Sequence, residues 1–531
     1  MQKINIPHSQ SGYLNSLMLD YLSDSELTKP FYNKRVSIAN LIESAKPESF
    51  QHIDRAVLEK VLSDQNKDLN LSDATKNNIL LFKKENSFCI VTAHQLNIYT
   101  GPLYVIYKTV STLIACRELQ LQSPKKNFIP VFVLGTEDHD LAEINHFHLF
   151  GKTYTWNSES TGVCGRMPTT DLQEITDALS SVFEGNTMMD ELLTIFNKAY
   201  NGTHTLAHAT RSILNALFGK YGLVIIDSDD ARLKAKTIDI ITDELLSQSS
   251  FKLVTATNEK LQQHFKEQAH AREINLFYVL DDIRERIVYD SESKMYSVLN
   301  TDLQFSQQEI LNIVKDNPER FSPNVILRPL FQQKILPALA YVGGGGELSY
   351  WLQLKSVFEL YRIPFPALML RNSVLLVDKN TQKKLQKLNL ELIEFFEEED
   401  ALIKKYILEN TDKEISLNTE KLSIEELYKQ LREKVNAIDT TLEKSVLAEM
   451  QNAINALQKL EAKLIKSQKN KSETEINQIR AVREKLFPGG IPQERFDNVL
   501  SRYSIFGDEF FQILMDNLNP FNPDLTVLYE D

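Results

Sequence analysis

The feature that most constrains the fold is an abrupt change of sequence pattern near residue 380. After it, glycine and proline are absent until Pro488, and leucine, isoleucine, glutamate and lysine dominate. Before it, short apolar runs typical of buried strands alternate with helical stretches, at 88–93, 128–135, 222–227, 275–280 and 324–330. Strands separated by helices indicate βαβ units and a mostly parallel sheet. We therefore expect an α/β, Rossmann-like core joined to an α-helical region.

Apolar residues in the second region recur with the spacing of a coiled coil. From Ile424 to Leu442 they fall at alternating intervals of four and three residues, which forms a heptad seam. The interval then stays at four residues as far as Ile454, a stutter that locally unwinds a supercoil. This pattern predicts one long helix over about 420–468, paired with helices around 380–409 and 472–486.

Three segments follow from these patterns. We assign 1–378 to the core, 379–486 to the helical coiled-coil domain and 487–531 to a C-terminal segment. A proline and two glycines at 488–490 end the last helix, because proline cannot continue a helix and glycine favours turns. The C-terminal segment is therefore expected to return toward the core.

Composition excludes several classes of protein. The 531 residues are 42% hydrophobic and 25% charged, as in ordinary globular chains, and no apolar run approaches the length of a membrane span. The N-terminus lacks the pattern of a signal peptide, which predicts a cytoplasmic protein. A net charge of −13 argues against a general nucleic-acid binder. Three cysteines without paired spacing predict reduced thiols rather than disulfides or a thiolate zinc site.

The run at 88–93 leads into the first candidate site. A polar turn follows it, and an amphipathic helix begins after Gly101 and Pro102. Backbone amides at the start of a helix can hold an anion. His94 and Asn97 in this turn could grip a phosphate group as charge develops during its transfer. The alternative is that His94 is a structural hydrogen-bonding residue.

The second candidate site follows the run at 128–135. Open α/β sheets bind ligands beyond the carboxyl ends of their strands, and this run ends in Glu137, Asp138, His139 and Asp140. Carboxylates and imidazoles can hold a metal ion or a substrate ammonium group. Consecutive residues of an extended segment point to opposite faces, so we favour direct substrate binding and predict no metal.

The third candidate site is a run of four glycines, Gly343 to Gly346. Glycine costs folding entropy and buries no side chain, so the run indicates a close approach of backbone, with a flexible hinge as the alternative. No Gly-Lys-Ser/Thr follows, so this is not a Walker A loop. Glu347, at the start of the next helix, could bind a substrate amine or hydroxyl group. Arg328 is a candidate clamp for a carboxylate.

Five blocks of sequence, in order along nearly the whole chain, resemble the BshC family, the cysteine-adding ligases of bacillithiol biosynthesis. They are AHQLNIYTGPLY, PVFVLGTEDHDLAEIN, GLVIID, LRPLFQQKILPALAYVGGGGELSYW and FPGGIPQERFDN. The resemblance implies a Rossmann-like core with inserted connecting segments and a C-terminal coiled coil through which two copies form a homodimer. It also implies an enzyme that joins the carboxyl group of cysteine to the amino group of glucosaminyl malate. Many members have Gln at His94 and Pro at Gly345, so neither residue is an invariant requirement.

Site residues are carried over from the matching blocks. The candidate catalytic residues are His94, Asp138, His139 and Asp140. The candidate substrate-binding residues are Gln95, Asn97, Thr100, Gly101, Glu137, Arg328, Tyr341, Gly343, Gly344, Gly345, Gly346, Glu347 and Tyr350. In this hypothesis activated cysteine lies over the His94 turn, and the acidic block positions the sugar amine or removes its proton.

ATP is the expected source of activation, because a carboxylate does not acylate an amine unaided at neutral pH. Cleavage to AMP would indicate a cysteinyl adenylate, and cleavage to ADP an acyl phosphate. Gln493 and Arg495 are candidate ligands of the nucleotide phosphates, and Trp351 is a candidate stacking surface for adenine. The alternative for this block is packing at a helix end.

Two other functions stay open at this point. One is a non-catalytic scaffold or binding protein whose long helices are the working surface and whose Rossmann-like core is a relic. The other is a synthetase-like enzyme that forms an adenylate for a different acceptor. The acidic composition, without a basic tract, disfavours tRNA as that acceptor.

Overall fold

The computed structural model describes residues 1–410, 416–522 and 524–530. The predicted ranges 379–486 and 487–531 extend over positions outside these described residues. The chain divides into two compact units. The larger unit contains 3–375 and 493–528, and the smaller unit contains 1–2, 376–492 and 529–531.

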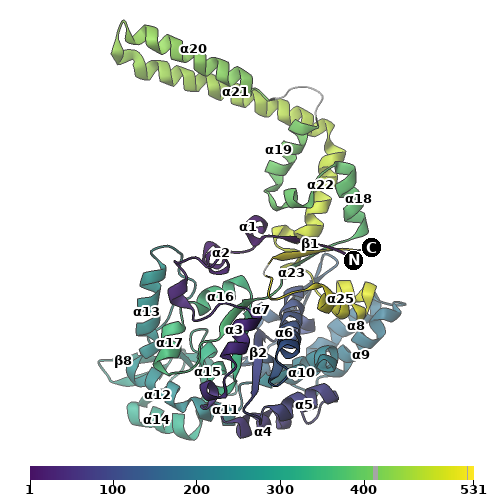
Figure 1. Cartoon of the computed structure of the whole chain (residues 1–531), viewed down its shortest axis with the longest axis vertical. Helices are drawn as coiled ribbons and strands as arrows, with labels where there is room; N and C mark the ends of the chain where they lie inside the picture. Colours follow the sequence, from purple (N-terminus) through teal and green to yellow (C-terminus); the bar gives the residue numbers. More distant parts are fainter. Residues whose placement is uncertain (411–415, 523, 531) are drawn as a thin grey trace. The chain divides into compact units, whose positions relative to one another are not determined.

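A five-stranded parallel sheet is the centre of the larger unit and confirms the predicted Rossmann-like α/β core (Figure 1). The strand order is β13-β12-β2-β3-β6. The strands are β2 (Ser87–Gln95), β3 (Asn127–Gly135), β6 (Val224–Asp227), β12 (Ala338–Gly343) and β13 (Ala367–Leu370). Their side chains are buried almost throughout, which explains why they read as continuous apolar runs.

The crossover between β2 and β3 is the long helix α6 (Leu103–Gln122), which packs against both strands. Its N-cap is Pro102, as the sequence predicts for the start of this helix. Most of α6 is buried, so it is more apolar than the usual surface helix. The two strands it joins pair in register from Ser87 with Asn127 to Gln95 with Gly135.

Two long segments are inserted between the parallel strands, as the family resemblance implies. The segment from 136 to 223 contains the hairpin of β4 (His146–Leu149) and β5 (Lys152–Thr155) and the helices α7 (Leu141–Ile144), α8 (Gln173–Val182), α9 (Asp190–Ala199) and α10 (Leu206–Phe218). The segment from 228 to 337 contains an antiparallel sheet in the order β10-β9-β8-β7-β11. Its strands are β7 (Leu276–Val279), β8 (Arg284–Asp290), β9 (Met295–Val298), β10 (Gln304–Ser306) and β11 (Phe321–Pro323).

Two of the five predicted parallel strands were wrong. The run at 275–280 forms β7, which belongs to the antiparallel sheet. The run at 324–330 forms a turn and the start of helix α15 (Arg328–Ile335). Asn324 Oδ1 accepts a hydrogen bond from the backbone N–H of Ile326 at 2.9 Å, which closes the turn, and Pro329 suits the first turn of a helix. The other two strands of the parallel sheet are β12 and β13, which were not predicted.

The smaller unit is helical, and the predicted single helix over 420–468 is wrong. Helix α20 (Asn418–Asn436) ends in a turn, and α21 (Glu443–Lys471) returns beside it as a hairpin. Asp439 stabilises the turn, because its side chain accepts a hydrogen bond from the N–H of Thr441 at 2.8 Å. The other helices are α18 (Lys379–Leu388), α19 (Glu399–Glu409) and α22 (Glu473–Leu486). Across the described part of the chain, every helix is too short or too polar to span a bilayer.

Candidate active site

A cavity of about 700 Å³ lies in the larger unit, at the carboxyl ends of the parallel strands. All five strands supply residues to its wall: Arg371 follows β13, the glycine loop follows β12, His94 and Gln95 end β2, Glu137 follows β3, and Ser228 follows β6. Ligands of open α/β sheets bind at this edge. The cavity is therefore the candidate active site.

Half of the predicted site residues line this cavity. They are His94, Gln95, Glu137, Asp138, Arg328, Gly344, Gly346, Glu347, Tyr350 and Arg495. The others do not line it, namely Asn97, Thr100, Gly101, His139, Asp140, Tyr341, Gly343, Gly345, Trp351 and Gln493. A second cavity of about 570 Å³, beside α9 and α10, contains none of the predicted residues.

His94 presents a neutral imidazole to the cavity. Its Nε2 lies 3.3 Å from the hydroxyl of Tyr104, and the two rings meet edge to face. Burial and the nearby charge of Lys108 lower the pKa of His94 to about 3. Asn97 is not its partner, because the Asn97 amide donates to the carbonyl of Glu143. The expected donor pair of His94 and Asn97 does not form.

Lys108 is a buried cation at the centre of the site. It projects from the apolar helix α6 and is 2% exposed. Its Nζ lies 2.8 Å from Glu347 Oε2 and also donates to the carbonyl of Ala93. Sequence reasoning missed this residue. The available signal was a lone lysine in the apolar stretch LYVIYKTVSTLIA, because a lysine is buried only when it is paired.

Glu347 holds two cations of the wall in place. Its Oε2 contacts Lys108 and the backbone N–H of Gly344, and its Oε1 accepts from Tyr341 and lies 3.9 Å from Arg328 Nη2. Burial by itself raises the pKa of Glu347, but the charges of Lys108 and Arg328 outweigh this effect and lower it to about 2. Glu347 is therefore ionised and fully engaged with the protein.

The glycine loop owes its composition to close packing. A Cβ at Gly343 would lie 2.8 Å from Leu348 Cδ2, and one at Gly345 would lie 2.5 Å from Leu14 Cδ2. A Cβ at Gly346 would meet nothing within 4 Å. Gly344 is the N-cap of α16 (Gly345–Trp351). At Gly343 and Gly345 the backbone thus lies close to side chains of the protein itself.

A second buried ion pair brings the C-terminal segment to the site. Arg371 donates to both carboxylate oxygens of Glu494, at 2.7 and 3.0 Å, and its guanidinium lies over the ring of Tyr104. The side chains of Arg371 and Glu494 are 4% and 2% exposed. Arg495 follows, reaches the cavity, and forms no hydrogen bond or ion pair with a described residue. Arg371 was also missed, although it directly follows an apolar strand.

The acidic block after β3 forms a tight turn, so its four side chains do not act together. Asp138 Oδ1 accepts from the N–H groups of His139 and Asp140, and its Oδ2 accepts from Gln95 Nε2 at 2.6 Å. The same Gln95 nitrogen donates to Glu143 at 2.6 Å. His139 and Asp140 are exposed and do not line the cavity, whereas Asp138 does. Asp138 is thus the predicted catalytic residue of this block that reaches the cavity wall.

His139 instead contacts the inserted antiparallel sheet. Its Nδ1 accepts a hydrogen bond from Arg284 Nη1 at 2.8 Å, and Arg284 stacks on the ring of Phe277. Both Arg284 and Phe277 line the cavity. These two residues belong to β8 and β7, so the inserted segment completes one side of the site.

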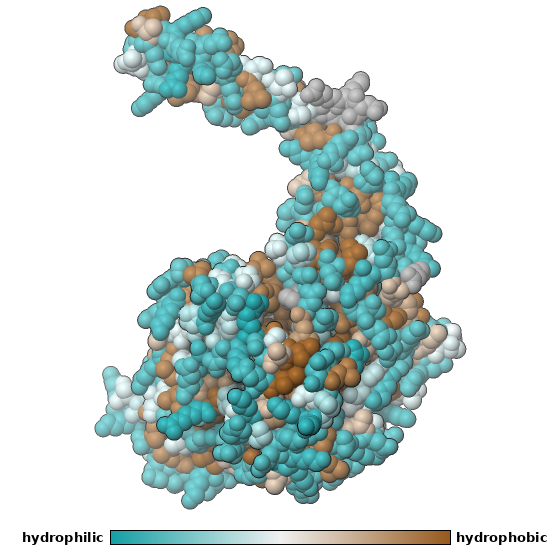
Figure 2. Space-filling view, in the orientation of Figure 1, coloured by the Kyte–Doolittle hydropathy of each residue, from teal (hydrophilic) through white to brown (hydrophobic). Residues whose placement is uncertain are grey.

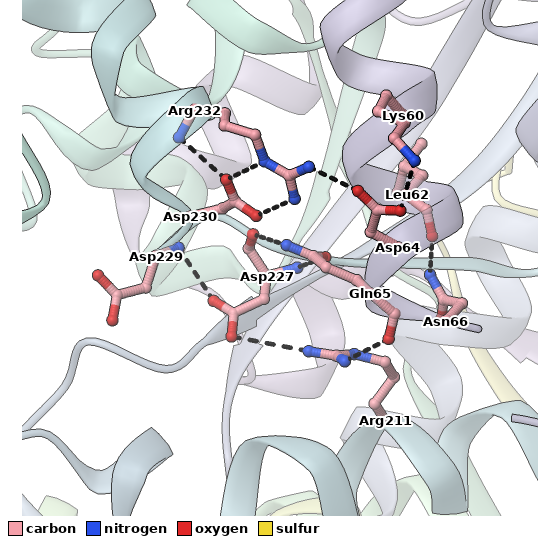
Figure 3. Close-up of polar contacts among 10 residues, drawn as sticks. All are labelled: Lys60, Leu62, Asp64, Gln65, Asn66, Arg211, Asp227, Asp229, Asp230 and Arg232. Atoms are coloured by element: carbon pink, nitrogen blue, oxygen red, sulfur yellow. Dashed lines mark hydrogen bonds and ion pairs between the residues drawn. The ribbon is translucent and has the colours of Figure 1, made fainter. Parts of the chain in front are cut away.

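Strand β6 ends in a network of acidic and basic side chains (Figure 3). The Asp227 carboxylate accepts from Thr136 Oγ1 at 2.5 Å and from the backbone N–H of Asp229 at 3.0 Å. Asp230 pairs with Arg232, which also reaches Asp64. These contacts hold the end of β6 beside the end of β3. The carboxylates of this network hydrogen-bond or pair within the protein and do not line the cavity.

The predicted nucleotide contacts at Trp351 and Gln493 are not available to a ligand. The Trp351 side chain is 0% exposed and stacks on Tyr341 with ring centroids 4.3 Å apart, inside the core. Gln493 is 2% exposed. An adenine ring would have to displace core side chains to reach Trp351. Among the described residues, no group of three His, Cys, Asp or Glu side chains is arranged to hold a metal ion.

A parallel sheet with a charged cavity at the carboxyl ends of its strands is typical of Rossmann-like proteins, which bind ligands there. The family model for the N-terminal Rossmann-like domain of bacillithiol biosynthesis BshC matches residues 1–372, and the model for its C-terminal coiled-coil domain matches 374–530. The chain therefore belongs to the BshC family, and its enzyme class is ligase.

Curated relatives agree with this assignment over their full length. A Flavobacterium psychrophilum protein is 38% identical over 527 residues, which cover 98% of each chain. A Flavobacterium johnsoniae protein is 38% identical over 525 residues, covering 98% of this chain and 99% of its own. A Salinibacter ruber protein is 30% identical, covering 96% and 95%. Each is named "Putative cysteine ligase BshC".

The pair of Arg371 and Glu494 predicts a large stability effect. Glu494→Ala leaves a buried guanidinium without its partner, and we expect the free energy of unfolding to fall by about 3–5 kcal/mol. Urea unfolding of the full chain measures the change. Glu26→Ala removes an exposed ion pair with Lys29 and should leave the unfolding curve unchanged. A Glu494→Ala protein as stable as the wild type would show that the pair is not buried in solution.

Proposed function

We propose that this ligase forms an amide bond between the carboxyl group of cysteine and the amino group of glucosaminyl malate, with ATP as the source of activation. The observation that carries the proposal is the distribution of charge along the sheet edge. Cations outnumber carboxylates on the β13 and β12 side of the cavity, which also carries Glu347, and carboxylates outnumber cations on the β3 side, which also carries Arg284. A substrate with carboxylates at one end and an amine at the other matches this arrangement. The names of the relatives support the same activity.

The cationic side suits the two carboxylates of the malyl group. Arg328 donates to Tyr350 through one nitrogen at 2.8 Å, and its charge is oriented by Glu347. Lys108 has three N–H bonds and uses two of them within the protein. Arg328 and Lys108 thus have donors left for a ligand. Both carboxylate oxygens of Glu347 already accept hydrogen bonds from the protein. We therefore assign Glu347 a positioning role in place of the predicted substrate binding.

The acidic side suits the amine of the acceptor. Glu137, Asp138 and Glu143 line this side, and Gln95 links the last two. Activated cysteine would lie between the two sides, over His94 at the end of β2. The neutral imidazole of His94 can accept or donate a hydrogen bond there without adding charge. Arg495, at the cavity and without a protein partner among the described residues, is the cation we assign to the nucleotide phosphates.

The decisive test is reconstitution with cysteine, glucosaminyl malate and ATP, followed by mass spectrometry. We expect bacillithiol to accumulate only when all three compounds are present. AMP as the second product would identify an adenylate, and ADP an acyl phosphate. Bacillithiol formed without ATP would contradict the activation step. Absence of bacillithiol with cleavage of ATP would favour an adenylate-forming enzyme with another acceptor.

Arg328→Ala should weaken acceptor binding specifically. Loss of a hydrogen bond to a charged group costs about 1.5–3 kcal/mol, so KM for glucosaminyl malate should rise about 10- to 150-fold while KM for cysteine changes little. Steady-state kinetics with each substrate varied in turn measures both constants. Arg117→Ala, at an exposed position away from the cavity, is the matched control. An equal loss of activity toward glucosamine, which lacks the malyl group, would contradict the assignment.

We also propose that two copies associate through the hairpin of α20 and α21. Helix α20 has no buried residue, and Figure 2 shows hydrophobic residues among hydrophilic ones along the hairpin. The two helices pack against each other, and Ile454 is the buried residue of α21. A set of apolar residues stays exposed, namely Leu422, Leu427, Leu431, Ile438, Leu442, Leu447, Leu460 and Leu464. Exposed apolar stripes of this kind are interaction surfaces.

Substitution of Leu427 and Leu431 by glutamate should give a monomer. Charges on the stripe would have to be desolvated in a dimer, so association becomes unfavourable. Light scattering after size-exclusion chromatography measures the mass. Leu121→Glu, which alters an apolar residue that is 69% exposed in the larger unit, is the control and should keep the dimer. A monomeric wild-type protein at micromolar concentration would contradict the proposal.

A further inference from the structure

The reaction needs a group that takes a proton from the attacking amine, and most acids of the site are already engaged. Both oxygens of Asp138 accept hydrogen bonds from the protein, as do both oxygens of Glu347. His94 is a weak base because its pKa is lowered to about 3 by burial. Glu143 lies at the exposed rim of the cavity. The remaining acid on the wall is Glu137.

Glu137 has one oxygen held by the protein and one open to the cavity. Its Oε1 accepts a hydrogen bond from Lys234. No described residue donates a hydrogen bond to Glu137 Oε2. This oxygen also keeps contact with solvent. The side chain is 13% exposed, and Glu137 lines the cavity. Oε2 is therefore available to a ligand.

Lys234 is placed to hold Glu137 in this orientation. The Lys234 side chain is 2% exposed, and its Nζ contacts Glu137 Oε1, Asp229 Oδ1 at 3.0 Å and the carbonyl of Glu319 at 3.3 Å. Two of these contacts are hydrogen bonds, to Glu137 and to the carbonyl of Glu319, and the contact with Asp229 is an ion pair. Asp229 is anchored in turn by Arg166 at 3.0 Å. A chain of contacts behind the cavity wall, from Lys234 through Asp229 to the exposed Arg166, thus holds the rotamer of Glu137.

We propose that Glu137 is the catalytic base of the ligase reaction and that Lys234 is its positioning residue. The proposal rests on the function proposed above. As the free amine nitrogen attacks the activated carbonyl carbon of cysteine, the C–N bond forms and one N–H proton passes to Glu137 Oε2. The bond from that carbon to the phosphate oxygen breaks, and the phosphate leaves with its electron pair. Water then takes the proton from Glu137 after the product departs.

The electrostatic surroundings suit this role. Burial raises the pKa of Glu137 above its ordinary value, and the charge of Asp229 acts in the same direction. Lys234 and Arg284 oppose the rise. A base must be unprotonated to act, so the rate falls as the pH drops through the pKa of Glu137. Removal of Lys234 would raise this pKa further and move the loss of rate to higher pH.

Glu137→Gln tests the base directly. The amide oxygen of glutamine can still accept the hydrogen bond from Lys234, so the fold should be kept, which circular dichroism and the melting temperature check. We expect kcat to fall about 100- to 10,000-fold with both KM values nearly unchanged. Glu137→Asp, which shortens the side chain but keeps the carboxylate, should recover part of the rate. Glu26→Gln, at an exposed surface position, is the matched control.

Lys234→Met tests the positioning residue through the pH profile of kcat. In the wild-type background the acidic limb should move to higher pH. In the Glu137→Gln background the same substitution should cause no shift, because the titrating group is gone. A kcat of Glu137→Gln within threefold of the wild type, or an equal shift in both backgrounds, would overturn the proposal. If the wild-type enzyme makes no bacillithiol, the proposed function fails, and the assignment of Glu137 falls with it.

Discussion

A charge removed from water must be paired inside the protein, because an unpaired buried ion is strongly destabilising. Three buried ion pairs satisfy this constraint around the cavity: Lys108 with Glu347, Arg371 with Glu494, and Lys234 with Glu137. Each pair has at least one member on the cavity wall and is held by further contacts behind it. The charges offered to a substrate are therefore fixed in direction before any substrate arrives, which lowers the cost of ordering them during the reaction.

The parallel sheet determines where these pairs can form. Its strands all end at one edge, so residues from distant parts of the chain meet there, and the long inserted segments supply the remaining wall. The balance of charge changes along this edge, from mostly cations beside β12 and β13 to mostly carboxylates after β3, where Arg284 also lines the cavity. The order of strands thus decides the polarity of the site.

Local pattern predicted some elements well and others poorly, for identifiable reasons. Strands β2 and β3 were predicted because both faces are buried and their apolar runs are continuous. The run at 275–280 is equally apolar, and nothing local shows which sheet a strand joins. The break after α20 escaped prediction because the heptad spacing continues across it: Val435, Ile438 and Leu442 keep their intervals although the chain turns between them.

The amino-acid sequence by itself determined the class of fold, the family, and the places where ionisable residues follow buried strands. Only the tertiary structure decided which of these residues face the cavity. Asp138 lines the cavity and His139 and Asp140 do not, while Lys108 and Arg371, which were not predicted as site residues, do line it. The physical reason is that burial and pairing depend on partners hundreds of residues away, such as Lys108 and Glu347, and no local pattern records such a contact.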